Sequence, residues 1–433
     1  MSVNLKSIIA LLLVYAALTS WSSILLAASG DQISVIEILG NVKTRVQVIR
    51  QEMIVKEGDQ FDPQQVERSR QNIMDLGLFK SVELSEARTE DGIEVTFTVD
   101  EKRYWYLIPV FNRGSDGDIT WGLRMQMDNL LGLNNQFTMR AKRKDFKDTD
   151  IQLEKTLELE YDYPRIFGSA YDLALRFDFD EADIEESRGV LSGDYFREKI
   201  TYGGSVSKWL TQDGSSKGYR LTLGLRSDVF DHEYLGGDPN LFTDVTVNSL
   251  LGAIQYIDVV DHGSYRSGRH HGMEVEMANS LVNSDVIHMS YNMFLRRYIS
   301  LNSEKRTNLN LQSRFGYITR SVFGDATYQV TGGTAIRGYN RDSIEGDTYY
   351  IANVEYLRPL GGRENLRGTA FIDAGDAFDE LSDFTFRDPK VGIGFGLRWK
   401  IRSFVRTDIR LDIAQGLGSE GETKIYAGTR ATF

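Results

Sequence analysis

Residues 332–343, GGTAIRGYNRDS, combine the residue types of a turn with a centre that could form a specific ion pair. Glycine, asparagine and aspartate favour turns, so we expect the segment to be a loop. At its centre stand Arg337, Gly338 and Tyr339. A guanidinium group can bind a carboxylate through two parallel hydrogen bonds, and Gly338 permits backbone conformations closed to other residues. A carboxylate on a neighbouring element would make this loop a fixed site.

Residues of catalytic type stand in patterns that disfavour an enzyme. His270 and His271 are adjacent, so on a strand they point to opposite faces and cannot chelate one metal together. Residues 261–264, Asp-His-Gly-Ser, contain the residue types of a catalytic triad, but they lie at a predicted turn and a triad depends on geometry. The chain has no cysteine, which excludes disulfides, zinc-thiolate sites and a cysteine nucleophile. We expect no enzymatic activity, no metal and no cofactor.

Two groups of glycines resemble ligand loops without the required context. Residues 416–421, GLGSEG, match the spacing of a dinucleotide-binding loop, but a strand rather than a helix is predicted to follow. The segment therefore lacks the helix N-terminus that binds phosphate and reads as a turn. Gly392, Gly394 and Gly396 fall on one face of a predicted strand, which suits a crowded or bent wall.

The composition favours strands and points away from nucleic acid. The 433 residues include 40 glycines, 21 tyrosines and 22 phenylalanines but only 6 prolines. A formal charge of −12 argues against a partner held through phosphate contacts. At the N-terminus, Lys6 precedes a long apolar run, and residues 1–29 read as a signal peptide. An uncleaved anchor is the alternative, because residues 7–30 are long enough to span a bilayer. In either case the chain leaves the cytoplasm.

Residues 30–102 predict a small domain with the element order β-α-α-β-β. A strand at 33–40 precedes a helix for which Thr44 and Gln47 form a capping box. A second helix starts at Asp62-Pro63, and two strands joined by Asp91-Gly92 follow. With the phrases NVKTRVQVIR and DLGLFKSVEL, this segment resembles the POTRA domain. A sheet of three strands leaves an edge to which an extended partner can add.

From residue 103 onward, polar and apolar residues alternate along short segments, as in DITWGLRMQMD at 118–128. We predict sixteen strands, near 103–112, 118–128, 134–143, 151–162, 170–180, 196–209, 217–227, 246–257, 268–279, 285–297, 305–318, 347–357, 365–373, 390–400, 404–414 and 423–433. An even number of strands of this length, each with one apolar face, is typical of an antiparallel transmembrane β-barrel, here residues 103–433. The longest connections are predicted at 181–195, 228–245, 319–346 and 374–389, all at the outer end of the strands.

A POTRA domain followed by sixteen strands resembles the BamA/TamA superfamily of outer-membrane proteins. In that family the sixth outer loop carries an Arg-Gly-Phe/Tyr motif, here Arg337, Gly338 and Tyr339. Residues 349–360, YYIANVEYLRPL, and 371–378, FIDAGDAF, resemble the family's strands after this loop. The resemblance implies that Arg337 pairs with Asp373, which alternation places on the lumen face.

The same resemblance implies the other site residues. Phe371, Gly375 and Tyr339 are expected near the pair, with Glu355 as a second carboxylate. Phe433 resembles the C-terminal signal of outer-membrane barrels, although Ala431 and Thr429 are smaller than that signal usually carries.

By this resemblance the chain lies in the bacterial outer membrane with the POTRA domain in the periplasm. It would insert or export client proteins, which the domain receives and the seam between the first and last strands releases. Expected partners are outer-membrane lipid, unfolded or extended client proteins and periplasmic accessory proteins. A dedicated secretion pore, a passive or structural barrel and an outer-membrane hydrolase are the alternatives.

Overall fold

The computed structural model describes residues 32–113, 119–145, 153–188, 191–210, 216–241, 243–319, 328–340, 343–405 and 408–428. The predicted signal peptide at 1–29 and the terminal Phe433 lie outside these residues. No helix within the described ranges is both long and apolar enough to cross a membrane.

The N-terminal module, residues 32–102, has the expected order of elements. These are β1 (Ile33–Leu39), α2 (Val46–Arg50), α3 (Pro63–Asp75), β2 (Phe79–Thr89) and β3 (Gly92–Glu101). The central strand β3 runs parallel to β1 and antiparallel to β2. The α3 helix begins as the sequence indicates, because the Asp62 side chain accepts a hydrogen bond from the Gln64 amide. Apolar residues of both helices and all three strands, with Ile49, Val66 and Phe97 fully buried, form its core.

The predicted capping box of the first helix is wrong. The helix starts after Arg45, which makes no side-chain cap, rather than after Thr44. The Thr44 hydroxyl instead lies 3.0 Å from the Tyr104 hydroxyl and accepts a hydrogen bond from Asn129 at 2.9 Å. This side chain is drawn away because it is buried at the junction between the module and the barrel sheet, where polar atoms require partners.

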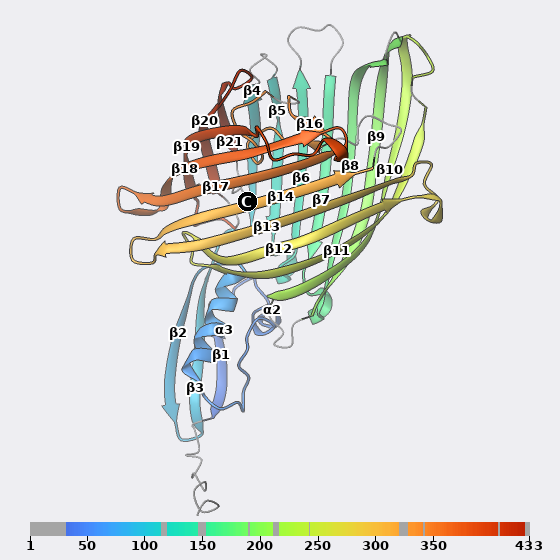
Figure 1. Cartoon of the computed structure of the whole chain (residues 1–433). Coiled ribbons are helices and arrows are strands. Elements are labelled where there is room, and N and C mark those ends of the chain that lie inside the picture. The colour runs from blue at the N-terminus through green and yellow to red at the C-terminus, as the bar shows by residue number, and fades with distance from the viewer. Residues whose placement is uncertain are drawn as a thin grey trace, which may run out of the picture.

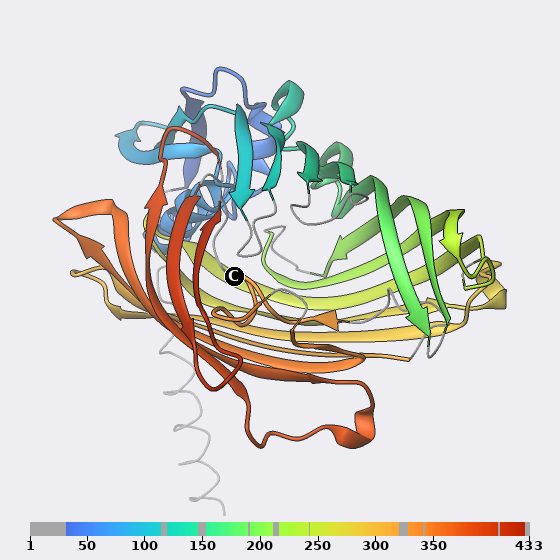
Figure 2. The same cartoon turned by 90° about the horizontal axis from the view of Figure 1, so that it is seen from above.

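The remaining chain forms one antiparallel sheet of sixteen strands that curls around a lumen (Figures 1 and 2), which confirms the predicted fold class. Its strands are β4 (Trp105–Arg113), β5 (Ile119–Asp128), β6 (Gln136–Asp145), β7 (Leu153–Tyr163), β8 (Tyr171–Arg188), β9 (Leu191–Trp209), β10 (Gly218–Gly237), β11 (Val245–Asp261), β12 (Arg266–Ala278), β13 (His288–Asn302), β14 (Thr307–Ile318), β17 (Thr348–Leu360), β18 (Arg363–Phe378), β19 (Lys390–Lys400), β20 (Asp408–Gly416) and β21 (Thr423–Gly428). The short strands β15 (Tyr328–Gln329) and β16 (Glu345–Gly346) pair separately, within the connection from β14 to β17.

Two of the predicted long connections are instead strand. The β8 and β9 strands continue through most of 181–195, and β10 continues to Gly237 within the expected loop 228–245. Backbone hydrogen bonds keep these segments in strands although they carry many charged residues. The alternation within the membrane-crossing segments did not predict this extension. The connection at 374–389 is shorter than expected for the same reason, because β18 runs to Phe378.

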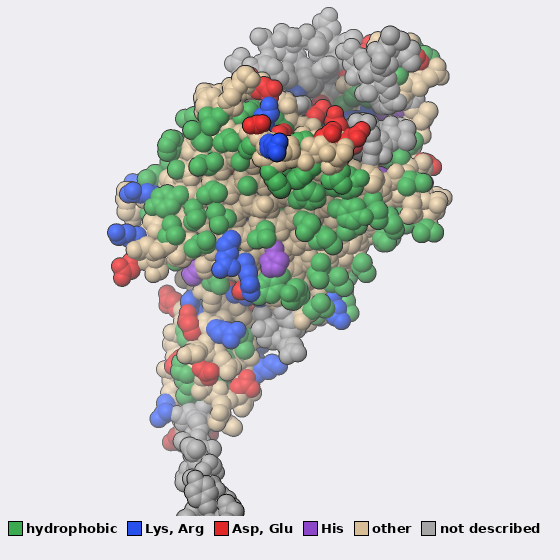
Figure 3. Space-filling view, in the orientation of Figure 1, with side chains coloured by type: hydrophobic (Ala, Val, Ile, Leu, Met, Phe, Trp, Pro, Cys, Tyr) green, Lys and Arg blue, Asp and Glu red, His purple; other side chains and the backbone are tan. Residues whose placement is uncertain are grey.

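Alternation along the strands separates an outer apolar face from a polar lumen. On β5, Trp121 is 50% exposed on the outside, whereas Gln126 is 1% exposed on the lumen side. Figure 3 shows the outer face as a broad apolar band over the strands labelled β11 to β18 in Figure 1, with charged side chains mainly at its margins and on the module. Such a band matches the hydrocarbon layer of a bilayer.

The two ends of the sheet, β4 and β21, define a seam. Within the part of the chain that the structure describes, hydrogen bonds connect neighbours from β4 through to β21 but do not join these two strands. Just before β4, Arg103 pairs with the turn between β19 and β20: its amide donates to Ser403 O at 2.7 Å and its carbonyl accepts from Val405 N at 3.2 Å. Val405 is fully buried in the core of the module. The start of β4 is thus bonded to the hairpin of β19 and β20, which precedes the last strand, β21.

Candidate functional site

The connection between β14 and β17 folds inward against the lumen wall. The inward loop, described at residues 328–340 and 343–346, begins and ends with the paired strands β15 and β16. A small apolar core holds it together and joins it to β17, through Val330, Ala335, Ile336, Tyr339, Ile344, Tyr349 and Ile351. The loop is therefore an ordered element packed on the wall, and its central arginine is held in a defined position.

Arg337 is fully buried and contacts carboxylates from three strands. Its Nε and Nη2 donate to the two oxygens of Asp373 on β18, at 2.6 and 2.8 Å. Its Nη1 donates to Glu355 Oε1 on β17 and to Asp412 Oδ2 on β20, both at 3.0 Å. The fork on Asp373 has the bidentate geometry that the motif predicts, and the third carboxylate is an addition.

Two further arginines complete this arginine-carboxylate network. Arg398 on β19 bonds Glu355 at 2.8 Å and also contacts Asp412. Arg410 on β20 lies 3.7 Å from Asp412 through its Nε. Three guanidinium groups thus face three carboxylates, so the formal charges cancel. A buried set of this kind tolerates the removal of one member poorly, because the remaining charges stay desolvated.

The loop motif and the family resemblance did not point to Asp412, Arg398 and Arg410. The signal was present, since alternation along 390–400 and 404–414 places all three on the polar face of their strands. Alternation shows which residues face the lumen. It does not show which of them lie side by side on the wall, because that depends on the register between strands. Here Arg398 pairs directly with Arg410 across β19 and β20.

Neighbouring side chains orient the central ion pair. Asn353 donates to Asp373 Oδ1 at 2.8 Å and to the loop carbonyl of Ala335 at 2.9 Å. The guanidinium carbon of Arg337 lies 3.4 Å from the ring centroid of Phe371, as in a cation–π contact. The predicted residues Asp373, Glu355 and Phe371 therefore all lie around Arg337.

Glycines bring the loop backbone onto the wall. Gly338 has φ of +94°, and a Cβ atom there would lie 2.2 Å from the amide nitrogen of Gly416. On β19, a Cβ at Gly392 would lie 1.9 Å from the carbonyl oxygen of Arg337. The crowded wall expected from the glycines of β19 is thus the surface that receives the loop, and Gly416 of the GLGSEG turn belongs to it.

Tyr339 anchors the other side of the motif. Its hydroxyl lies 3.0 and 2.8 Å from the carbonyl oxygens of Val391 and Leu417 and accepts from the Val391 amide at 2.9 Å. Gly375 on β18 lies beneath the loop, where a Cβ atom would be 3.1 Å from the Ile336 side chain. Both predicted residues therefore touch the packing between loop and wall.

The inward loop also bonds directly to the last strand. The Gly338 amide donates to the Tyr426 hydroxyl of β21 at 2.9 Å, and the Gly338 carbonyl accepts from the Glu422 amide at 2.8 Å. Lys424 and Glu422 contact Asn340 of the loop. One side of the seam is consequently attached to the loop that carries Arg337.

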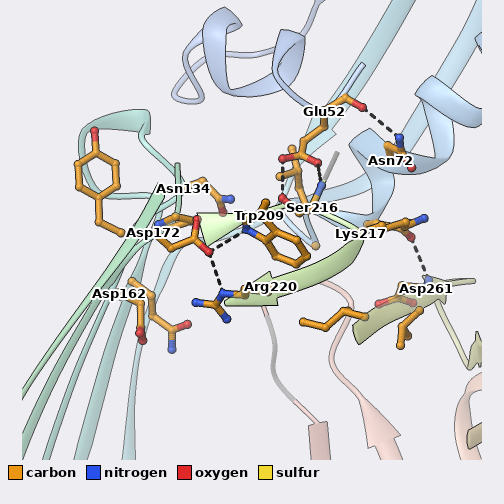
Figure 4. Close-up of a pocket in the computed structure, with 18 of the residues that line it drawn as sticks. Glu52, Asn72, Asn134, Asp162, Asp172, Trp209, Ser216, Lys217, Arg220 and Asp261 are labelled. Carbon is orange, nitrogen blue, oxygen red and sulfur yellow. Dashed lines mark hydrogen bonds and ion pairs between the residues drawn. The ribbon is translucent and has the colours of Figure 1, made fainter. Parts of the chain in front are cut away.

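At the opposite end of the strands, the module lies against a polar cavity of about 850 Å³ (Figure 4). Glu52 accepts from Arg165 Nε at 3.1 Å and from the amide and hydroxyl of Ser216 at 3.0 and 2.8 Å. Burial raises the pKa of Glu52, while Arg165 and Ser216 act in the opposite direction. The module therefore contacts the connections from β7 to β8 and from β9 to β10 through a buried carboxylate.

Asp75, at the end of α3, makes a second contact of this type. Its carboxylate lies 2.6 Å from Lys217 Nζ and accepts from the Asp261 amide at 2.9 Å. Inside the cavity, Asp172 accepts from Trp209 at 2.9 Å and pairs with Arg220 at 3.2 Å (Figure 4). The connections that touch the module follow β7, β9 and β11, which are the fourth, sixth and eighth strands of the barrel sheet counted from β4. They therefore mark its periplasmic end.

The other motifs noted in the sequence lie in turns between strands. His262 lies 2.7 Å from Ser267 through its Nε2, and Asp261 pairs with Lys400, so residues 261–264 form a structural turn. The GLGSEG segment joins β20 to β21. No group of three or more histidines, aspartates or glutamates among the described residues could hold a metal ion.

Fold and site together define an outer-membrane β-barrel protein with one POTRA domain and an inward-folded loop. The Omp85 superfamily domain matches residues 129–426, and the POTRA domain described as a surface antigen variable number repeat matches residues 32–102. The chain belongs to the Omp85 superfamily. It lies in the outer membrane with the POTRA domain on the periplasmic side.

Two curated relatives are outer membrane protein assembly factors BamA. The protein from Neorickettsia risticii is 25% identical over 223 residues, which cover 51% of this chain and 28% of the relative. The protein from Neisseria meningitidis is 26% identical over 148 residues, covering 32% and 18% respectively. The matched regions thus span less than a third of each relative.

Solved structures share the fold at low identity. BamA from Haemophilus ducreyi lacking POTRA domains 1–3 has a TM-score of 0.52 at 16% identity, covering 92% of this chain and 84% of that one. CdiB from Acinetobacter baumannii has a TM-score of 0.62 at 11% identity, covering 92% and 73%. CdiB from Escherichia coli has a TM-score of 0.64 at 12% identity, covering 92% and 76%.

Proposed function

We propose that this protein inserts client proteins into the outer membrane or exports them through it, and that the seam between β4 and β21 is where a client leaves the lumen. The module receives an extended client by strand addition at an edge of its sheet. The client then passes the polar cavity at the periplasmic end and reaches the seam. Arg337 holds the loop that is attached to β21.

The observation that carries this proposal is the pair of hydrogen bonds between Gly338 and the β21 side of the seam. A strand at the end of a sheet has backbone groups that can pair with another strand. Because Tyr426 and Glu422 bond to the loop rather than to β4, movement of the loop and movement of this end strand are coupled. The arginine-carboxylate network then determines how readily that movement occurs.

A disulfide across the seam tests this route. The native chain has no cysteine, so a pair consisting of one cysteine on β4 and one on β21 can be scanned for oxidative closure without background. We expect the closed pair to abolish client insertion or export, and reduction to restore it. As a control, cysteines at Met273 and Met293, which face each other across β12 and β13, should form a disulfide without loss of activity. Full activity with the seam closed would exclude this route.

Depletion separates the possible client classes. If the protein inserts barrels in general, many outer-membrane proteins should decrease together in membranes of depleted cells. Loss of a single exported protein would identify a dedicated secretion pore. If no protein changes, the barrel is passive or structural, and the proposal is wrong.

A further inference from the structure

The connection between β18 and β19, residues 379–389, carries an aromatic cluster that the site described above does not use. Phe384 and Phe386 come from this connection, with ring centroids 4.9 Å apart. They contact Tyr350 on β17 at 5.6 and 4.9 Å, and Phe384 also contacts Phe378 at 5.5 Å and Phe315 on β14 at 5.8 Å. Five rings, contributed by three strands and one connection, therefore form one continuous cluster. We call this cluster of Phe315, Tyr350, Phe378, Phe384 and Phe386 the plate.

This plate lies on the outer face of the barrel sheet. Tyr349 and Ile351 pack against the inward loop, so Tyr350 between them points outward. Phe315 is the direct cross-strand partner of Tyr350 and shares its face. Phe378 lies five residues beyond the lumen-facing Asp373, which also places it outside. In Figure 2 the orange connection after β18 stands on the convex side of the sheet, away from the lumen.

The plate is continuous with the surface that contacts lipid. Outward residues on the neighbouring strands are strongly exposed, with Ile372 at 53% and Phe395 at 74%. Phe386 is 72% exposed, although two rings lie beside it. Moving one phenylalanine side chain out of water is favourable by about 1.5–3 kcal/mol, so an uncovered ring at this position favours a lipid contact.

The connection also has the polarity of a segment at the membrane surface. Asp379, Glu380, Asp383 and Asp388 are all exposed on the same eleven-residue segment, so it is unsuited to the hydrocarbon interior. Aromatic rings beside polar groups are typical of the layer where acyl chains meet headgroups. Because the module marks the periplasmic end of the strands and β18 runs away from it, this connection belongs to the outer leaflet.

We propose that the connection between β18 and β19 is a membrane anchor, with Phe384 and Phe386 inserted at the headgroup boundary of the outer leaflet beside β14, β17 and β18. Barrel strands ordinarily supply the aromatic residues of this layer. Here a connection folds back over the outer face and adds two more. The anchor fixes the depth in the membrane of the strands that carry Glu355 and Asp373.

Spin labels test the depth of this connection, because the chain has no native cysteine. In lipid vesicles, a label at Phe386→Cys should collide frequently with oxygen and rarely with a water-soluble nickel chelate. A label at Phe395→Cys supplies the lipid-facing reference, and a label at Asp388→Cys supplies the matched aqueous control on the same connection. Position 386 should lie close to the reference at 395, with several-fold less nickel contact than position 388.

Two results with the label at position 386 would overturn the anchor. Equal nickel accessibility at 386 and 388 would place the rings in water. Protection from both oxygen and nickel would mean that protein, either a second copy or a client, covers the plate. As a second measurement, a label at Thr385→Cys should gain nickel contact several-fold in the Phe384→Ser/Phe386→Ser variant, with heat-dependent gel mobility verifying the fold. An unchanged label in a folded variant would also contradict the proposal.

Discussion

Asp412 on the penultimate strand lies 3.0 Å from Arg337, although 75 residues separate them. The same carboxylate contacts Arg398 and neighbours Arg410. Arg337 is therefore not half of a simple pair with Asp373 but the centre of a charge set that spans β17 to β20. This relationship changes what substitutions in the loop should do.

Replacing Arg337 with alanine should strongly destabilise the barrel. Three carboxylates would lose a common donor in a site without solvent, and breaking a buried ion pair costs about 3–5 kcal/mol. Urea titration of the refolded protein in detergent measures this loss. Arg337→Lys should recover only part of it, because an ammonium group cannot make the fork on Asp373. Exposed Arg387 provides the control, and Arg387→Ala should change stability by less than about 0.5 kcal/mol.

Exchanging the charges of Arg337 and Asp373 should fail to restore stability. In a simple pair the exchange would re-form the contact. Here an aspartate at 337 would face Glu355 and Asp412, both of which lie 3.0 Å from the present guanidinium nitrogen. The Arg337→Asp/Asp373→Arg variant should therefore be no more stable than Arg337→Ala in the same titration. Recovery to near the native value would show that Asp412 and Glu355 contribute little.

Asp412→Asn and Arg337→Ala should be non-additive. Removing Asp412 leaves Arg398 and Arg337 with one carboxylate fewer, which should destabilise the fold by about 3 kcal/mol. Residues in one buried network commonly couple by about 0.5–3 kcal/mol, so the double variant should lose less than the sum of the single losses. A double-mutant cycle in urea measures the coupling. Strict additivity would indicate that the two residues act independently.

Gly338→Ala should weaken the attachment of β21 to the loop. The new methyl group would meet the Gly416 backbone at 2.2 Å in addition to the strain of a φ of +94°. Gly332→Ala is the matched control, because φ there is +114° but no atom lies within 4 Å. Its cost should be limited to backbone strain, about 1–3 kcal/mol. Hydrogen exchange at the β21 amides should increase in the first variant and stay near native in the second.

Docking of the module should tighten as pH falls. Burial raises the pKa of Glu52 above its ordinary value of 4.5, so the folded protein binds a proton there before the unfolded chain does. The free energy of unfolding therefore rises as pH falls from the raised pKa of the folded state towards 4.5. This contribution is lost as pH rises above the raised pKa. Protection of the amides at 216–218 from hydrogen exchange reports the docking.

A matched pair of variants isolates this effect. Glu52→Gln keeps the shape of the side chain without its titration and should remove the pH dependence at 216–218. Glu57→Gln changes an exposed glutamate of the same module, which should leave that dependence in place. The assignment to Glu52 fails if both variants retain the native pH profile.

Much of this architecture could be predicted because it rests on local patterns. Alternation in segments such as 118–128 indicated which residues face lipid, and the count of sixteen strands agrees with the structure. Asp62 and Pro63 located the start of α3 because a cap and its helix are adjacent in the chain. The capping box at Thr44 failed because burial at the module junction gave that hydroxyl other partners.

Alternation in the sequence indicated a lumen face that includes Asp373 and a loop with an arginine at its centre, and the family resemblance paired the two. The folded sheet adds Asp412, Arg398 and Arg410 to this pair, and it bonds Gly338 to the β21 side of the seam. The reason is physical: side-chain alternation is a property of each strand alone, whereas convergence depends on the register and curvature of the whole sheet. Neither quantity is encoded within any one segment.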